Sequence, residues 1–219
     1  MNSTKQSRPS FVLLYTSVIY ACLFGLIAIA VGNLKIEQFD HVIISYVQGM
    51  ESPTLTTVMK FFTWIGGGLP VIVIIILTMV VLFVFLRHRK ELIFLVTVVI
   101  GSALINMVLK HLFSRSRPDF HRLIEVGGYS FPSGHSMSAF SFYGALAYLL
   151  WRHIPGSLGR VILIVLSSMF ILFIGLSRIY LGVHYPSDVL GAYLVSSCWL
   201  SCSIWGHQRL MEHSNIPHI

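Results

Sequence analysis

The stretch that decides the fold runs from residue 69 to residue 86 and reads LPVIVIIILTMVVLFVFL. It contains no charged residue, and it is long enough to cross the roughly 30 Å hydrocarbon core of a bilayer as a helix. Comparable apolar runs occupy residues 11–31, 92–109, 136–151, 158–176 and 189–205. The sequence therefore predicts an all-α integral membrane bundle of six transmembrane helices.

The composition supports a membrane protein rather than a water-soluble one. Of the 219 residues, 55% are hydrophobic and only 11% are charged, whereas a soluble domain has about 25% charged residues. The formal net charge of +7 does not indicate nucleic-acid binding, because the cations lie at the ends of apolar runs and form no basic stripe. We expect one membrane-embedded domain, 1–219, with the bilayer as its environment and no nucleic-acid partner.

The segment between the first two spans, residues 32–68, is more polar than its surroundings. Its apolar residues recur at helical spacing at Phe39, Ile43, Ile44 and Val47, which predicts a short helix lying along the membrane surface. Residues 55–65 predict a second interfacial helix, and the glycines that follow it end the helical pattern before the second span. We assign no role to this segment.

The first apolar run, residues 11–31, could be either a cleaved signal peptide or an uncleaved transmembrane helix. Residues 28–30 fit the small-residue pattern of a signal-peptide cleavage site, but the run is longer than a signal core, which favours an uncleaved first helix.

One side of the predicted bundle carries eight basic residues: Lys5, Arg8, Arg87, Arg89, Lys90, Arg152, Arg160 and Arg209. The other side carries four once three clustered cations are set apart. We therefore expect cytoplasmic termini and an extracytoplasmic cluster.

Three short stretches hold most of the residues that a purely apolar bundle does not need. They are KHLFSRSRP at 110–118, FPSGH at 131–135 and SRIYLGVHYPSD at 177–188. In a six-helix bundle, the connection between the third and fourth spans and the connection between the fifth and sixth spans lie on the same side of the membrane. All three stretches are therefore predicted to converge at one end of the bundle.

The cluster contains more cations than it can neutralise. Lys110, Arg117 and Arg178 lie at or near membrane depth, where an unpaired charge costs about 2.5–3.5 kcal/mol on insertion scales. Asp188 compensates only one of them, so the site requires an external anion, and a phosphate has the charge to balance it. Arginine suits this role because its planar fork binds two phosphate oxygens.

The remaining polar residues of the cluster provide chemistry. Ser133 is a predicted N-cap, and a helix N-terminus with Gly134 beside it offers backbone N–H groups to phosphate. Asp188 lies four residues after His184, so its carboxylate can orient that imidazole as a nucleophile. His135 can protonate a leaving oxygen. The set predicts phosphoryl transfer without a metal or another cofactor.

These residues resemble the three-part signature of the type 2 phosphatidic acid phosphatase (PAP2) superfamily. The matching pattern is Lys110-x6-Arg117-Pro118, then Pro132-Ser133-Gly134-His135, then Ser177-Arg178-x5-His184-x3-Asp188. The resemblance implies that the phosphate is bound by Lys110, Arg117, Ser133, Gly134 and Arg178. It also implies that His135 is the general acid, that His184 forms a phosphohistidine and that Asp188 orients it. The resemblance decides which histidine attacks, since sequence alone separates the two poorly.

Within the superfamily, the chain is most similar to the small six-helix bacterial members of the phosphatidylglycerophosphate phosphatase B group. The lead-in at residues 128–131 also resembles that group. The resemblance implies a lipid phosphate substrate, either phosphatidylglycerophosphate or undecaprenyl diphosphate, cleaved at the outer face of a bacterial inner membrane. It gives no preference between these lipids and no oligomeric state.

Two other functions fit parts of the pattern. An anion transporter or channel also uses intramembrane Lys and Arg, although here these cations gather at one face. A haloperoxidase binds vanadate in the same cradle, but the known members of that branch are soluble. Near the cluster, His111, His121 and Arg115 are expected to be polar loop or headgroup-facing residues, with substrate contact as the alternative. Asp119, Glu125 and His121 fit no metal-site spacing well.

Overall fold

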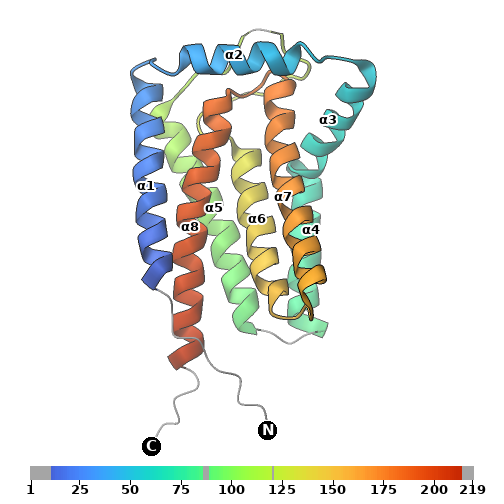
Figure 1. Ribbon diagram of the computed structural model, residues 1–219. Coiled ribbons are helices and arrows are strands. Elements are labelled where there is room, and N and C mark those ends of the chain that lie inside the picture. The colour runs from blue at the N-terminus through green and yellow to red at the C-terminus, as the bar shows by residue number, and fades with distance from the viewer. Residues whose placement is uncertain (1–10, 86–88, 120, 214–219) are drawn as a thin grey trace, which may run out of the picture.

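The computed structural model describes residues 11–85, 89–119 and 121–213, and these residues form helices and connections without a strand (Figure 1). The helices are, in chain order, α1 (Phe11–Gly32), α2 (Glu37–Gln48), α3 (Pro53–Ile65), α4 (Gly68–Val80), a π-helical turn (Val81–Phe85), α5 (Arg89–Phe113), α6 (Gly134–Trp151), α7 (Ser157–Tyr180) and α8 (Pro186–His213). Lys5, Arg8, Leu86 and Arg87, on which part of the orientation and the second span depended, lie outside the described residues.

The long helices run side by side, and α2 lies across one end of the bundle (Figure 1). The start of α1 and the end of α8 lie at the opposite end. The short helix predicted within 32–68 is confirmed as α2, which buries Asp40, Ile44 and Val47. Phe39, expected on the same apolar face, is 41% exposed.

Helix α6 lies at the centre of the bundle, where it packs against α5, α7 and α8. The nine buried residues of α6 are Ser136, Met137, Ala139, Ser141, Phe142, Tyr143, Ala145, Ala147 and Leu149. Five of them are serine or alanine. Small side chains allow neighbouring backbones to approach closely in a membrane bundle. The helix that begins at the predicted site is therefore held on three sides.

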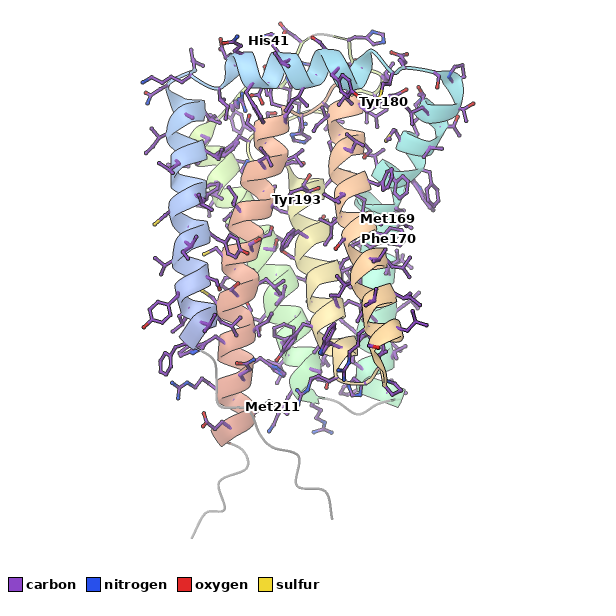
Figure 2. The ribbon with its side chains drawn as sticks, viewed as in Figure 1. His41, Met169, Phe170, Tyr180, Tyr193 and Met211 are labelled. Carbon is purple, nitrogen blue, oxygen red and sulfur yellow. The ribbon has the colours of Figure 1, made fainter. Side chains whose placement is uncertain are left out.

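The second helix of this segment, predicted over residues 55–65, is present, and its place at the membrane surface stays a prediction. Residues 55–65 fall within α3, which packs against α7 and joins α4 at an angle of 49°. The predicted break between them is confirmed, since α3 ends at Ile65 and Gly67 is the N-cap of α4. Tyr180, at the α2 end of α7 (Figure 2), holds the start of α3 through a 2.8 Å hydrogen bond between its hydroxyl and that of Thr56.

The chain is a multi-pass membrane protein, but the structure does not by itself reproduce the predicted count of six spans. Among the described helices, α1, α5, α7 and α8 are each long and apolar enough to cross a membrane, and the bent pair α3–α4 adds a fifth span if it counts as one. Helix α6 is not among these candidate spans, and it contains His135, two glycines and three serines. Helix α6 is surrounded by α5, α7 and α8, so it can contain polar residues inside the bundle. The count of six spans stays a prediction.

The contact between α5 and α8 gives a test of this packing. A Cβ atom added at Gly101 would overlap the indole ring of Trp199, whose Nε1 donates a 3.1 Å hydrogen bond to the Val98 carbonyl. We expect Gly101→Val to lower the free energy of unfolding by about 1–3 kcal/mol, because overpacking forces the helices apart. Thermal unfolding in detergent measures this. Gly25→Val on α1, where an added Cβ meets nothing within 4 Å, is the control, and equal destabilisation of both variants would contradict the packing.

Candidate active site

The three stretches singled out in the sequence meet at the end of the bundle that α2 covers. Lys110 lies in the last turn of α5, Ser133 and Gly134 lie at the start of α6, and Arg178 lies in the last turn of α7. The turn that joins α7 to α8 contains His184, and Asp188 lies in the first turn of α8. The Ser133 N–H donates to the Asp188 carbonyl at 3.1 Å, which joins the second stretch to the third.

His184 and Asp188 form a buried pair. His184 Nδ1 lies 3.2 Å from Asp188 Oδ2, and the two side chains are 2% and 0% exposed. An ionised carboxylate only accepts hydrogen bonds, so Nδ1 carries the proton and the lone pair of Nε2 points the other way. That Nε2 atom lies 3.0 Å from the Arg117 guanidinium. The imidazole is therefore oriented with a basic nitrogen toward the cations.

The surroundings of His184 keep its ring neutral. The pKa of His184 is lowered from its ordinary 6.5 to about 4, mainly by burial and also by the nearby charges of Arg178 and Arg117. The hydrogen bond and the charge of Asp188 act in the opposite direction without cancelling the effect. A neutral imidazole is available as a nucleophile at physiological pH.

Asp188 accepts more hydrogen bonds than the sequence indicated. Its Oδ2 atom also accepts from the Ser130 hydroxyl and, at 2.9 Å, from the Tyr185 N–H. Its Oδ1 atom accepts a 2.7 Å charged hydrogen bond from Arg115. Arg115 is a polar residue of the loop after α5, as one of the expectations had it, but it does not face headgroups, since its side chain is 14% exposed and is paired within the protein.

The cation side of the site is only partly satisfied. Arg178 is 2% exposed, and its NH1 group donates to the Thr63 hydroxyl of α3. Its Nε and NH2 atoms are buried and have no hydrogen-bond partner in the protein. Arg117 donates to three backbone carbonyls, and Lys110 donates to the Tyr129 carbonyl. Buried donors are nearly always paired in proteins, so the unpaired atoms of Arg178 indicate an anion site.

The N-terminus of α6 lies beside these cations, with one correction to the prediction. Ser133 is the N-cap residue, but its side chain makes no capping hydrogen bond. Its hydroxyl instead accepts a 3.0 Å hydrogen bond from Ser136, within the first turn. Gly134 begins the helix, and a Cβ added there would lie 3.1 Å from Asn106 Oδ1. The first backbone N–H groups of the helix are therefore not used by the Ser133 side chain.

His135, the second residue of α6, lies within electrostatic reach of Lys110, Arg117, Arg178 and His184. The backbone of the α3–α4 break lies against its ring, because a Cβ added at Gly67 would overlap the imidazole. The structure thus brings all eight predicted site residues to one end of the bundle.

A cavity of about 280 Å³ lies between α4, α5 and α6 and reaches the start of α6 at Gly134. Most of its wall is apolar, and a few hydroxyl and amide groups line the side of α6 and α5. The lining comprises Val71, Ile72, Ile75, Val99, Ser102, Ala103, Asn106, Gly134, Met137, Ser138 and Ser141. An apolar chain attached to a phosphate at Gly134 would find apolar surroundings there.

Several contributors to the site were missed by the sequence analysis. Ser130, Tyr185 and Thr63 contact Asp188 or Arg178, and Asp40 of α2 contacts Arg115 at 2.9 Å. Only Asp40 had a usable signal, because it shares the buried face of an amphipathic helix with apolar residues. Of the other residues considered near the cluster, His111 is exposed, and His121 forms an exposed 2.9 Å ion pair with Glu51.

The comparison with family models agrees with this geometry. The model described as the PAP2 superfamily matches residues 91–212, which include every predicted site residue. The chain belongs to the PAP2 superfamily.

Several other proteins match much of the chain. Phosphatidylglycerophosphatase B of Bacillus subtilis (strain 168) is 34% identical over 82% of this chain and 89% of its own length. The Escherichia coli (strain K12) protein YbjG, provisionally named an undecaprenyl-diphosphatase, is 32% identical over 58% of this chain and 67% of its own length. The crystal structure of a transmembrane PAP2-type phosphatidylglycerolphosphate phosphatase from Bacillus subtilis has a TM-score of 0.78 at 30% identity, and it covers 94% of this chain and 100% of that chain.

The neutral state of His184 can be measured directly. We expect the ring of His184 to remain neutral, with its proton on Nδ1, from pH 8 down to about pH 5 and to titrate near a pKa of 4. The physical reason is that burial penalises the charged imidazolium. ¹⁵N NMR of histidine-labelled protein in detergent follows the titration, and His184→Ala identifies the resonance. A midpoint near the ordinary 6.5 would contradict the buried environment.

Proposed function

We propose that this PAP2 protein hydrolyses the terminal phosphate of a membrane lipid phosphate by attack of His184 on phosphorus. That it is a membrane lipid phosphatase follows from its family and from the names of its relatives. The observation that carries the mechanism is the pair of buried, unpartnered nitrogens of Arg178 beside a neutral, oriented histidine.

The reaction divides into two steps in this geometry. Lys110, Arg117 and Arg178 hold the phosphate together with the Ser133 hydroxyl and the backbone N–H groups at Gly134. His184 Nε2 attacks phosphorus, the N–P bond forms, the P–O bond to the lipid breaks and His135 gives a proton to the leaving oxygen. Water then attacks the phosphohistidine with His135 as the base, which releases phosphate and restores His184. Asp188 stabilises the charge that develops on the imidazole.

The cations supply the electrostatic stabilisation that Mg²⁺ supplies in other phosphoryl-transfer enzymes. The charge on the phosphate oxygens meets fixed positive groups in a buried setting, where they act more strongly than in water. The reaction as proposed therefore needs no metal and no cofactor.

Two lipids fit best as substrates. The relatives are named for phosphatidylglycerophosphate and for undecaprenyl diphosphate, and both present a terminal phosphate on a long apolar group. The leaving group is phosphatidylglycerol in the first case and undecaprenyl phosphate in the second. The apolar cavity of about 280 Å³ beside Gly134 has room for the first part of either kind of chain.

The protein acts as one membrane domain, 1–219, in a bacterial inner membrane, with its termini in the cytoplasm and the active site at the extracytoplasmic surface. This placement is supported by the sequence, in which the predicted side of the termini has more basic residues once the clustered cations are set apart. In the structure, α1 begins and α8 ends at the end opposite the site (Figure 1). The substrate then enters from the lipid phase rather than from water.

The two other functions have less support. A transporter would place its cations along a path through the membrane, whereas Lys110, Arg117 and Arg178 gather at one end of the bundle. A haloperoxidase of this superfamily would be expected to be soluble, and this chain is a multi-pass membrane protein.

A phosphate-release assay tests the proposal. Purified protein in mixed micelles is given phosphatidylglycerophosphate, phosphatidic acid and undecaprenyl diphosphate in separate reactions. We expect phosphate release from at least one lipid and a fall of at least about 10³-fold in His184→Ala, because the nucleophile is lost. Full activity in His184→Ala would contradict the mechanism, and the ranking of the three lipids identifies the substrate.

The metal requirement has its own test. We expect the rate to persist after treatment with EDTA, because cationic side chains stabilise the transition state. Rates are compared before chelation, after chelation and after the addition of Mg²⁺ or Zn²⁺. Loss on chelation with recovery on metal addition would show a metal enzyme instead.

Replacing Arg178 tests the phosphate cradle. We expect Arg178→Lys to lower kcat/KM by about 10²-fold, the usual effect of removing one donor from a transition-state site. A single ammonium cannot both reach Thr63 and present two nitrogens to phosphate. Arg160→Lys, near the opposite end of the same helix α7, is the matched control, and we expect it to retain the wild-type rate.

A further inference from the structure

The buried carboxylate of Asp40 lies far from the signature residues in sequence but next to them in space. Asp40 belongs to α2, the helix that crosses the end of the bundle, and it is 0% exposed. Its Oδ1 atom accepts a 2.8 Å hydrogen bond from the Ser187 N–H. Its Oδ2 atom accepts from the Ser187 hydroxyl at 2.6 Å and from Arg115 at 2.9 Å. The carboxylate is thus fixed at both oxygens.

Arg115 connects this carboxylate to the one that orients the nucleophile. Its NH2 group pairs with Asp40, while its NH1 group donates to Asp188 Oδ1 at 2.7 Å and to the Ser187 hydroxyl at 2.8 Å. Its guanidinium also stacks on the Tyr185 ring at 3.9 Å from the ring centroid. One planar fork therefore bridges two buried carboxylates, which a lysine cannot do.

The bridge completes the hydrogen bonding of Asp188. A carboxylate has about four acceptor positions, and Asp188 receives four donors: Arg115, Ser130, Tyr185 N–H and His184. Arg115 is the charged donor among them and the one held from outside the α7–α8 turn by α2. Loss of that donor leaves Asp188 Oδ1 without its charged partner and changes the charge next to His184.

We propose that Asp40 and Arg115 are positioning residues that hold Asp188 against His184, so that α2 completes the catalytic site. The inference rests on the proposed function of His184 as the nucleophile. Asp40 and Arg115 do not touch the phosphate in this scheme. They act through the Asp188 carboxylate, in the order Asp40, Arg115, Asp188, His184.

The charges around His184 determine what a perturbation should do. The ionisable groups that face it from the packed elements are Lys110 on α5, Arg117 and Arg115 in the 114–133 connection, His135 on α6, Arg178 on α7 and Asp188 on α8. Asp40 on α2 acts on this set through Arg115. Removing the Arg115 cation should raise the pKa of His184, and removing the Asp40 anion should lower it, because Arg115 then acts with its full charge.

The experiment uses Asp40→Asn and Arg115→Gln in the full-length protein. We expect each substitution to lower kcat for lipid phosphate release by about 10- to 100-fold with a smaller change in KM, as for misplacement of a catalytic group by a distant change. We also expect the ¹⁵N NMR titration of His184 to shift in opposite directions, upward in Arg115→Gln and downward in Asp40→Asn. A purely structural role would not produce opposite shifts.

Two further variants protect the test against misfolding. Arg115→Gln leaves two buried carboxylates without a counter-charge, so the double variant Asp40→Asn/Arg115→Gln removes one charge of each sign. We expect its loss of kcat to equal that of Arg115→Gln alone, because the two residues act in series. Arg115→Lys keeps the positive charge but not the planar fork. We expect it to lower kcat without raising the pKa of His184.

The control is Glu51→Gln. Glu51 also lies near the covered end of the bundle, where it pairs with His121 and is partly exposed, but no hydrogen bond links it to Asp188. We expect its kcat and its His184 midpoint to match the wild type. Losses of equal size in Glu51→Gln and Asp40→Asn would overturn the inference, and so would an unchanged kcat and midpoint in Asp40→Asn.

The result is separable from the proposed function. If the wild type released no phosphate from any lipid, or if His184→Ala kept full activity, the proposed function would fail. The opposite NMR shifts would still establish the link from α2 to His184 in that case. If the wild type were active and His184→Ala inactive, while Asp40→Asn kept the wild-type rate and midpoint, only the present inference would fail.

Discussion

The carboxylate of Asp188 is the group on which the arrangement of the site depends. It is fully buried, and a buried charge is tolerated only when its hydrogen-bonding positions are filled. Its four donors come from residues 115, 130, 184 and 185, so the connection between α5 and α6 must fold back onto the start of α8. The Ser133 N–H bond to the Asp188 carbonyl fixes the start of α6 to the same point. Satisfying one anion thus brings three separate chain segments into register.

The two faces of His184 are treated differently by the protein. On the Nδ1 side, the carboxylate has a full set of donors. On the Nε2 side, Arg178 has two buried nitrogens without a protein partner. The hydrogen bonds on the Nδ1 side hold the imidazole in place, while the free donors of Arg178 are those that the proposed mechanism assigns to the phosphate. Donors fixed in place before the reaction need no reorganisation when charge develops, which is the main source of electrostatic catalysis.

The sequence could predict the site residues whose positions follow from local spacing or from the order of the helices. The spacing of His184 and Asp188 across a helix start places them in contact, and counting helices brings Arg178 to the same end as Ser133 and Lys110. Asp40 could not be found in this way, because its partners lie about 75–147 residues away and only tertiary packing decides which acid they meet. Asp40 lies on the buried face of α2, one turn before Ile44. The amphipathic spacing indicates that it is buried but does not indicate which residues it contacts.

The same limit explains where the predicted fold and the structure differ. Hydropathy identified the helices that face lipid, but α6 is held by its neighbours, so it can contain serines and a histidine that lower its hydropathy. The α3–α4 pair bends by 49° at the glycines that predicted a break there, and one of them, Gly67, lies against His135. In both places the sequence departs from a simple membrane span where the chain approaches the phosphate cradle. The polar residues of α6 and the glycines between α3 and α4 therefore indicate the same end of the bundle as the charged motifs do.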